Sequence, residues 1–256
     1  MSRSATVPKL PPLIAPARPE AEKRTLGQFF TPPELAEFIA GFFTRDLRDW
    51  RLIDAGAGAG ALTLATVKHA LRQRPRPATF HVTAYEIDPA AVVLLRQTLD
   101  HCATLCAAEG VVFSSDLRAE DFIDHSLGAL EQNLFSPEPE TFNAAIANPP
   151  YRKLSTGSLQ HRRLCAAGIE ASNLYSAFLS LLSRLLDAEG ELAAIVPRSF
   201  CNGPYFRSFR RDFLSRMAFR RLHVFGSRNT LFSAEAVLQE NIVFCAYRSP
   251  TPANQI

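Results

Sequence analysis

Short apolar runs alternate with stretches of helical periodicity along most of this chain. Each apolar run has the length of a buried strand, and most are followed by a segment whose apolar residues recur every three or four positions. This pattern predicts strands at residues 50–54, 80–85, 111–114, 142–147, 191–196, 220–225 and 240–247. It predicts helices at about residues 32–44, 61–70, 89–107, 173–187 and 204–216. Repeated strand–helix units predict an α/β fold with a doubly wound, mostly parallel sheet and an antiparallel last strand.

The ends of the chain differ from its middle. Residues 1–24 are rich in proline and show little apolar periodicity, so we expect a disordered N-terminal tail. Order is expected from residue 25, and residues 25–248 are expected to form one domain. Residues 249–256 resemble a tail or the start of a linker.

The segment Thr31-Pro32-Pro33-Glu34 has the features of a helix start. Thr31 is the predicted N-cap, a proline occupies the first helical position and a carboxylate follows. A helix N-terminus of this kind can also receive a ligand carboxylate through its free N–H groups. A simple capped helix is the alternative.

Composition and charge exclude few classes of protein, but the cysteine pattern predicts a cellular location. The chain has 256 residues, of which 47% are hydrophobic, and a net charge of +3, too mild to indicate a nucleic-acid partner by itself. Its five cysteines form no Cys-x-x-Cys pair and no His/Cys metal spacing, so we expect no metal and a reducing, cytoplasmic location. We find no signal peptide and no apolar run of membrane-spanning length.

Arginines are concentrated in one region near the C-terminus. The cluster predicts either a solvated helix face or contact with phosphates. Its members are Arg207, Arg210, Arg211, Arg216, Arg220 and Arg221.

The central feature of the chain is Asn148-Pro149-Pro150-Tyr151, directly after the expected strand 142–147. Two prolines cannot continue a sheet, so the strand must end here and present Asn148 at its carboxyl edge, where α/β sheets bind ligands. The amide oxygen and a neighbouring carbonyl can accept the two hydrogens of an exocyclic amine, and Tyr151 can stack on its ring. The alternative is a strand-ending turn with a packed tyrosine.

A second group of residues predicts a cofactor site at the same edge. Gly56, Gly58 and Ala61 match Gly-x-Gly-x-x-Gly/Ala between a strand and a helix, a pattern shared by nicotinamide, flavin and S-adenosylmethionine enzymes. Glu86 follows the next strand and is placed to bind ribose hydroxyls, while Asp54 precedes the glycine loop and can orient it or meet an amino group.

Asp121 and Phe122 form a further pair suited to a cofactor. The carboxylate can accept hydrogens from an adenine amino group, and the phenylalanine can lie beside the ring. A turn or N-cap aspartate is the alternative. The sequence shows no evident acid–base residue for hydride transfer, which favours a methyl donor over NAD.

Together these motifs resemble the gamma class of N6-adenine DNA methyltransferases, with the BsuBI/PstI-type modification enzymes of bacterial restriction systems most similar. In that class Thr-Pro-Pro precedes the glycine loop and Asn-Pro-Pro-Tyr, and the resemblance covers about residues 25–248. It implies a Rossmann-like S-adenosylmethionine-dependent methyltransferase fold, S-adenosyl-L-methionine as cofactor and adenine-containing duplex DNA as partner. Asn-Pro-Pro-Tyr alone also occurs in glutamine and RNA methyltransferases.

The resemblance also implies roles for individual residues. Thr31 would bind the methionine carboxylate, with Asp54 and Gly56 lining the methionine part of the site. Ile87, Asp121 and Phe122 would make the adenine pocket, with Phe178 nearby. Asn148 and Pro149 would accept hydrogens from N6 of a flipped-out adenine, and Pro150 belongs to the same turn. Tyr151 would stack on the base, with Phe232 on its other side; an ordinary loop anchor is the alternative for Phe232.

The chain departs from this class in one respect. Such enzymes usually carry a further target-recognition domain, which is apparently absent here; either the protein is truncated or split, or a separate recognition domain or subunit is its partner. The implied activity is methyl transfer to adenine N6 in DNA. An RNA or protein-glutamine methyltransferase, or a non-autonomous catalytic fragment, remains the alternative.

Overall fold

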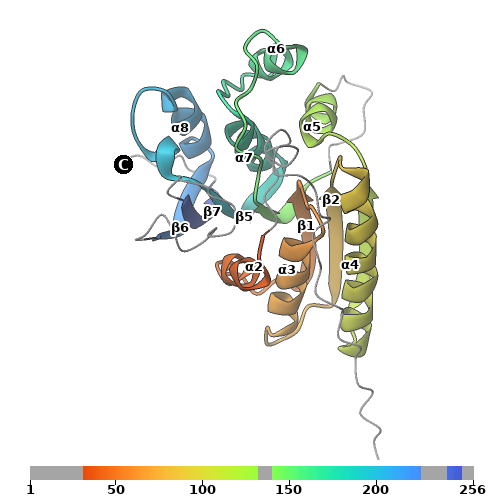
Figure 1. Cartoon of the computed structure of the whole chain (residues 1–256). Coiled ribbons are helices and arrows are strands. Elements are labelled where there is room, and N and C mark those ends of the chain that lie inside the picture. Colours follow the sequence, from red (N-terminus) through yellow and green to blue (C-terminus); the bar gives the residue numbers. More distant parts are fainter. Residues whose placement is uncertain (1–30, 132–139, 226–240, 250–256) are drawn as a thin grey trace, which may run out of the picture.

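The computed structural model describes residues 31–131, 140–225 and 241–249, which form a seven-stranded sheet with helices on both faces (Figure 1). The strands are β1 (Asp49–Ala55), β2 (Thr79–Tyr85), β3 (Val112–Arg118), β4 (Phe142–Ala147), β5 (Leu186–Pro197), β6 (Met217–Val224) and β7 (Asn241–Arg248). The helices are α2 (Pro33–Ala40), α3 (Ala61–Leu71), α4 (Pro89–Ala108), α5 (Phe122–Leu130), α6 (Leu159–Ala166), α7 (Leu174–Leu185) and α8 (Arg207–Leu214). A short 3₁₀ turn, η1 (Arg198–Cys201), follows β5.

The strand order confirms the predicted doubly wound, mostly parallel sheet. The order is β3-β2-β1-β4-β5-β7-β6, with β7 antiparallel to both neighbours and the other adjacent pairs parallel. Because β1, β2 and β4 are parallel, their carboxyl ends meet at one edge, and the direction of winding reverses between β1 and β4. This topological switch point is the usual ligand-binding position of such sheets.

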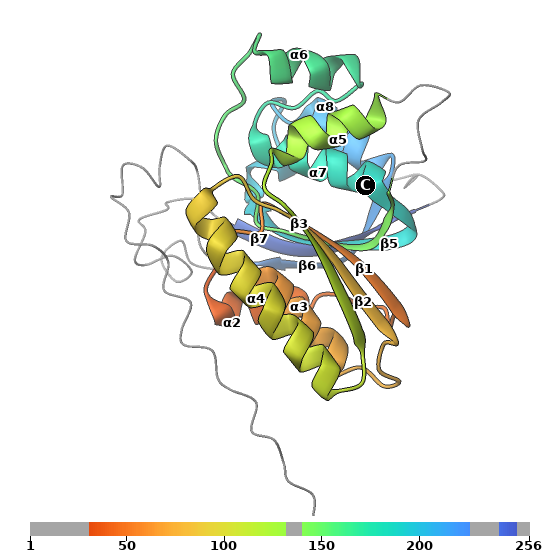
Figure 2. The ribbon, with the colours of Figure 1, turned by 90° about the vertical axis from the view of Figure 1, so that its right-hand side faces the viewer.

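Two hydrophobic cores lie on opposite faces of the sheet. Neighbouring residues of β1 serve different cores: Leu52 packs with Phe80 of β2 and Leu95 of α4, whereas Ile53 packs with the α7 side. Figure 2 shows α3 and α4 on one face and α5 and α7 on the other. Because both faces are covered, the central strands are continuously apolar rather than alternating.

The helix predicted after Thr31 differs at both ends from its observed form. The N-cap of α2 is Pro32, with no side-chain capping bond, so Thr31 is not the cap. The helix ends at Ala40 rather than Thr44, and Gly41 forms its C-cap. The Thr44 N–H instead donates to the buried Glu191 of β5 at 2.9 Å, a tertiary contact in place of a helical one.

Further differences concern element lengths and two helices that the pattern did not predict. β3, β5 and β6 include residues outside the expected ranges, since β-pairing continues beyond the apolar runs. The expected loop around Ala119–Phe122 leads directly into α5, with Asp121 as its N-cap. α6 is largely polar, and Leu164 is its only buried residue, so it has little apolar periodicity to detect.

Candidate active site

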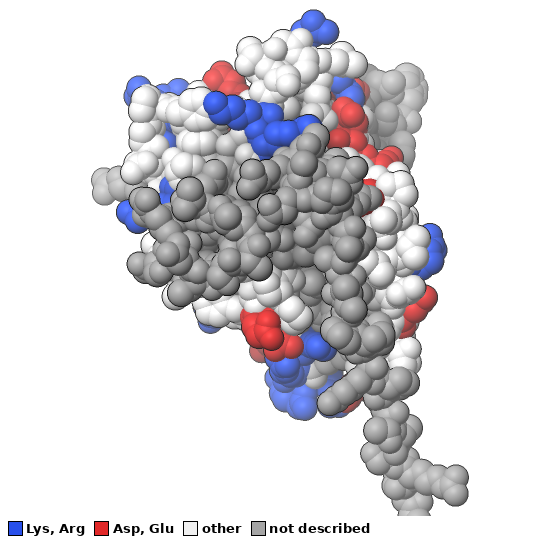
Figure 3. All heavy atoms as spheres, viewed as in Figure 1, with Lys and Arg blue, Asp and Glu red and all other residues white. Residues whose placement is uncertain are grey.

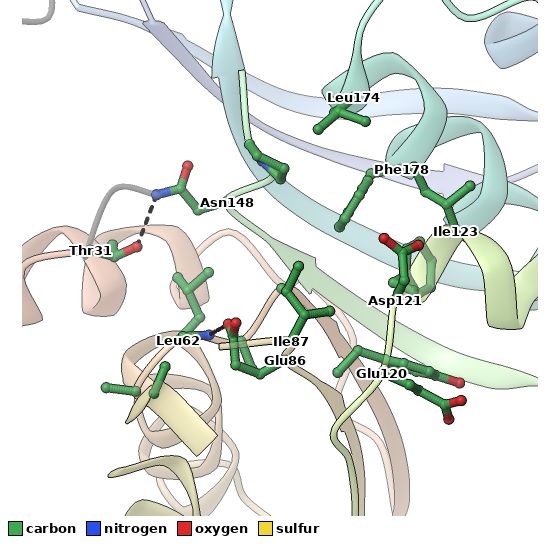
Figure 4. A pocket seen from close by; sticks show the side chains of 18 of the residues that line it. Thr31, Leu62, Glu86, Ile87, Glu120, Asp121, Ile123, Asn148, Leu174 and Phe178 are labelled. Carbon is green, nitrogen blue, oxygen red and sulfur yellow. Dashed lines mark hydrogen bonds between the residues drawn. The ribbon is translucent and has the colours of Figure 1, made fainter. Parts of the chain in front are cut away.

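The carboxyl ends of three neighbouring parallel strands bring the predicted motifs to one pocket (Figure 4). β1 leads into the glycine loop, β2 into Glu86 and β4 into Asn148. The loop after β3 adds Asp121, and α7 adds Phe178. Predicted residues that line the pocket are Thr31, Gly56, Gly58, Glu86, Ile87, Asp121, Phe122, Asn148 and Pro150.

The glycine loop has a left-handed backbone at three positions, and each glycine serves a different need. Gly58 has φ +58°, and a Cβ there would meet no atom within 4 Å, so the pocket is open beside its backbone. Gly60 has φ +86°, and a Cβ would lie 2.8 Å from Thr98 of α4. The sequence motif placed its last position at Ala61 and missed Gly60, whose role is close packing against α4.

Glu86 joins the glycine loop to the end of β2. Its Oε2 accepts the Gly58 N–H at 2.8 Å, and its Oε1 accepts the Asp88 N–H at 2.8 Å. Burial raises the pKa of this carboxyl, although the backbone N–H groups oppose that effect. A carboxylate has about four acceptor positions, so Glu86 can hold the loop and also accept a hydroxyl hydrogen from a ligand.

An apolar slot with a carboxylate beside it lies at the β3 side of the pocket. Ile87 and Phe178 face one another across the pocket, with Asp121 beside them (Figure 4). Ile87 is 53% exposed, as expected for an apolar wall of an open site. Phe122 is buried behind this slot, with its ring 4.9 Å from that of Phe178. The slot matches a flat aromatic ring with a hydrogen-bond donor at its edge.

Asp121 has two structural partners in addition to its place at the pocket. Its Oδ1 accepts the Asp124 N–H at 3.0 Å as the N-cap of α5. The same oxygen accepts a hydrogen from Nε2 of Gln160 in α6 at 3.2 Å. Gln160 lines the pocket and was not identified from the sequence, because α6 itself was not predicted.

Asp54 is fully buried beneath the glycine loop and is not among the pocket-lining residues. Its Oδ2 accepts the Thr63 hydroxyl hydrogen at 2.6 Å, while Oδ1 has no hydrogen-bond partner among the described residues. Burial raises the pKa of Asp54 to about 7, against the lowering effect of Thr63. This position supports the predicted orienting role for the loop more directly than contact with a ligand.

The Asn148 amide is held from two sides. Its Nδ2 donates to the Thr31 hydroxyl oxygen at 3.1 Å (Figure 4), and its Oδ1 accepts the Tyr151 hydroxyl hydrogen at 3.2 Å. Thr31 is therefore used as an acceptor for Asn148 rather than as a helix cap, because tertiary contact places the amide within its reach. Thr31 and Asn148 both line the pocket that contains the glycine loop.

The remaining residues of the turn have distinct environments. Pro149 is buried, whereas Pro150 and Tyr151 are half-buried. The Tyr151 ring lies edge-on to Tyr175, with centroids 6.2 Å apart, and burial raises the pKa of its phenol, which keeps it a hydrogen donor at neutral pH. Pro149 and Tyr151 are not among the pocket-lining residues, and Phe232 lies outside the described residues.

Most of the arginine cluster holds the fold together. Arg210 donates to the carbonyls of Phe200, Asn202 and Gly203 around η1, and Arg221 donates to the Gly41 carbonyl. Arg216 lies 3.5 Å from Asp212, and Arg220 pairs with Glu189 and Glu191. Arg207 and Arg211 are exposed on α8, which leaves both predictions for them open, a solvated helix face and contact with phosphates. Figure 3 shows the described Lys and Arg residues in several separate groups on one face.

Two further properties hold for the described part of the chain. Residues 31–131, 140–225 and 241–249 contain no cluster of three or more His, Cys, Asp or Glu side chains suited to a metal ion. None of the helices in those ranges is both long enough and apolar enough to cross a membrane.

The sheet and the pocket at its switch point define the fold of S-adenosylmethionine-dependent methyltransferases. A class I S-adenosylmethionine-dependent methyltransferase structure from Listeria monocytogenes superposes with a TM-score of 0.65 at 12% identity, covering 90% of this chain and 65% of that one. Residues 103–232, about half of the chain, match the Eco57I restriction-modification methylase family. The chain belongs to this family.

Two named relatives agree with that assignment. The chain is 40% identical to the type II methyltransferase M.PstI of Providencia stuartii over 225 residues, and 38% identical to M.BsuBI of Bacillus subtilis over 224 residues. These alignments cover 88% and 86% of this chain, but only 43% of each relative. The resemblance to BsuBI/PstI-type modification enzymes is thus confirmed, and the chain spans less than half of their length.

Proposed function

We propose that this protein transfers a methyl group from S-adenosyl-L-methionine to the N6 amino group of a flipped-out adenine in DNA, within a bacterial restriction–modification system. The observation that carries the proposal is that one pocket contains both the glycine loop with Glu86 and the Asn148 amide. Membership of the Eco57I methylase family and the likeness to M.PstI and M.BsuBI support DNA as the substrate. A cytoplasmic location fits such an enzyme.

The pocket residues fit S-adenosyl-L-methionine in shape and chemistry. The open space beside Gly58 leaves room for the ligand against the loop backbone. Glu86 would accept ribose hydroxyl hydrogens, and the slot between Ile87 and Phe178 would take the adenine ring, with Asp121 beside its amino group. Thr31 would meet the methionine carboxylate. When bound, the cofactor supplies an electrophilic methyl group on a sulfonium.

The residues of the catalytic turn would prepare the acceptor amine. The Asn148 Oδ1 and the Pro149 carbonyl would accept the two N6 hydrogens, which localises the nitrogen lone pair and stabilises the positive charge that develops on it. The amine would take the methyl group that the bound sulfonium supplies, leaving a neutral thioether, and the excess proton of the product amine would pass to water. No strong general base is needed, so alignment of the two reactants supplies much of the acceleration. Tyr151 and Phe232 would stack on the two faces of the extruded base.

The test is methyl transfer from labelled S-adenosyl-L-methionine to unmethylated bacterial DNA, followed by nucleoside analysis. The proposal expects N6-methyladenine, and no such product from an Asn148→Ala variant. Labelled RNA or protein glutamine instead of DNA would favour the RNA or glutamine alternative.

A non-autonomous catalytic fragment that needs a separate DNA-recognition subunit is the second candidate function; the alignments cover 43% of M.PstI and of M.BsuBI. Such a fragment would bind the cofactor but transfer no methyl group alone. Addition of a separate DNA-recognition subunit would then restore N6-methyladenine formation.

A further inference from the structure

α6 belongs to a loop segment, residues 152–174, that starts directly after the catalytic turn. At its base, the Leu174 N–H donates to the Arg152 carbonyl at 2.9 Å, and the Leu154 N–H donates to the Ser172 carbonyl at 3.3 Å. Lys153 and Asn173 form an antiparallel bridge between these two bonds. The two strands of the base are thus fixed to each other, and the position of α6 is defined relative to Tyr151.

The α6 end of this loop segment packs on α5, across the pocket from Asn148. Arg163 of α6 pairs with Asp124 at 3.2 Å and with Glu131 at 2.9 Å. Leu164 is fully buried in the core cluster on this face of the sheet. The buried Leu164 and the Gln160–Asp121 bond hold this end of α6 beside the N-terminus of α5, and the exposed Arg163 pairs add little to this.

Gln160 has more hydrogen-bonding capacity than the fold uses. It lines the pocket, and one hydrogen of its Nε2 is donated to Asp121 Oδ1 at 3.2 Å. A primary amide also offers an acceptor oxygen, and one of its two N–H bonds lies beside that oxygen on the same edge of the group. Among the described residues, Asp121 is the hydrogen-bond partner of the Gln160 amide. When Asp121 accepts the hydrogen that points away from Oε1, the paired acceptor–donor edge of the amide is left for a ligand.

That edge matches one class of ligand. An adenine ring presents an amino hydrogen next to a ring nitrogen acceptor, and a glutamine amide can bind both at once. The apolar slot of Ile87 and Phe178 lies at this side of the pocket, beside Asp121 (Figure 4).

We infer that Gln160 is a specificity-determining residue for the adenine ring of the cofactor. Its Oε1 accepts an amino hydrogen, and its free Nε2 hydrogen is donated to the adjacent ring nitrogen. This inference rests on the proposed function, because it assumes an adenosyl cofactor in this pocket.

The test compares two probes, S-adenosylhomocysteine and its inosine counterpart, which carries a carbonyl in place of the amino group. Binding of each is measured by calorimetry for the wild type, Gln160→Ala and Arg163→Ala. Arg163 also links α6 to α5 but does not line the pocket, so Arg163→Ala is the matched control. Thermal melting confirms that all three proteins are folded.

The wild type is expected to prefer the adenosyl probe. Gln160→Ala should reduce that preference by about tenfold, the size of a lost bidentate contact, while Arg163→Ala leaves it within about twofold. An equal weakening of both probes by Gln160→Ala would overturn the inference, as would an equal loss of preference in Arg163→Ala. Failure of the wild type to bind S-adenosylhomocysteine would instead contradict the proposed function itself, and the inference with it.

Discussion

The Asn148 Nδ2 group donates to the Thr31 hydroxyl oxygen at 3.1 Å, across 117 positions of sequence. Asn148 directly follows the central strand β4, and Thr31 directly precedes Pro32, the N-cap of α2, so the bond joins the catalytic turn to the N-terminal wall of the cofactor pocket. The bond also restricts the position of the Asn148 amide, because the Thr31 hydroxyl contacts one end of it and the Tyr151 hydroxyl the other. Thr31 is in this way a positioning residue for Asn148 as well as a candidate for ligand contact.

Replacement of Thr31 by valine should slow methyl transfer at saturating cofactor. Valine has a similar shape but cannot accept the Asn148 hydrogen, so the amide loses one of the two contacts that restrict its position. Loss of one hydrogen bond of this kind predicts a rate about tenfold lower. Thr31→Ser retains the hydroxyl and should keep most of the activity. Equal rates for the valine and serine variants in a steady-state assay would argue against this role.

Glu86→Gln should weaken binding of S-adenosylhomocysteine by about tenfold or more. An amide in place of the carboxylate loses one of the two backbone bonds that join Gly58 and Asp88, and it provides one fewer acceptor for a ribose. Glu120→Gln is the matched control. Glu120 also lines the pocket, but its carboxylate pairs with His125 at 2.9 Å rather than with the loop. If calorimetry shows that both variants lose affinity for S-adenosylhomocysteine to a similar extent, the negative charge of the pocket rather than the loop contact determines affinity.

Gly60→Ala should lower the free energy of unfolding by roughly 2–4 kcal/mol, since a methyl group would press on Thr98 and Leu95 and the backbone is left-handed. Gly110→Ala is the control: Gly110 has φ +73°, but a methyl group at its Cα would meet no atom within 4 Å. Its replacement tests only the effect of placing alanine in a left-handed backbone, and it should lower the free energy of unfolding by about 1 kcal/mol. Urea denaturation measures both. A Gly110→Ala loss as large as that of Gly60→Ala would refute the packing argument.

The buried Asp54 predicts a pH-dependent stability in the absence of ligand. Burial raises its pKa from 3.8 to about 7, so the folded state binds more protons than the unfolded state between these values. The free energy of unfolding should therefore fall as the pH rises from about 4 to 7, by at most about 4 kcal/mol from this group. Asp54→Asn keeps an acceptor for Thr63 and should flatten this part of the profile. An unchanged slope in the variant would show that other groups cause it.

Much of the site follows from the sequence because strand ends are easy to locate. Two prolines must end β4 at Asn148, and Glu86 directly follows the apolar run of β2, so their meeting at one sheet edge is a consequence of parallel topology. The S-adenosylmethionine-type fold and the restriction–modification family follow from the resemblance of the motifs to gamma-class methyltransferases, and both are confirmed. The individual roles of the site residues remain predictions.

Other features depend on contacts that no local pattern encodes. The Thr31 hydroxyl could bond to its own helix or to a distant amide, and only the tertiary structure decides in favour of Asn148. Gly60 is required by two side chains of α4, and nothing in the loop itself distinguishes it from Gly58. Helix α5 did leave a signal: Phe122, Ile123 and Leu127 have helical spacing after the capping Asp121.

The most direct test of the central claim separates the chemical step from cofactor binding in Asn148→Ala. Single-turnover methyl transfer to DNA measures the first, and calorimetric titration with S-adenosylhomocysteine measures the second. If Asn148 holds the N6 amine for attack, the transfer rate should fall at least about a hundredfold while the dissociation constant changes by less than about threefold. A loss of affinity as large as the loss of rate would contradict the account and make Asn148 part of the cofactor site instead.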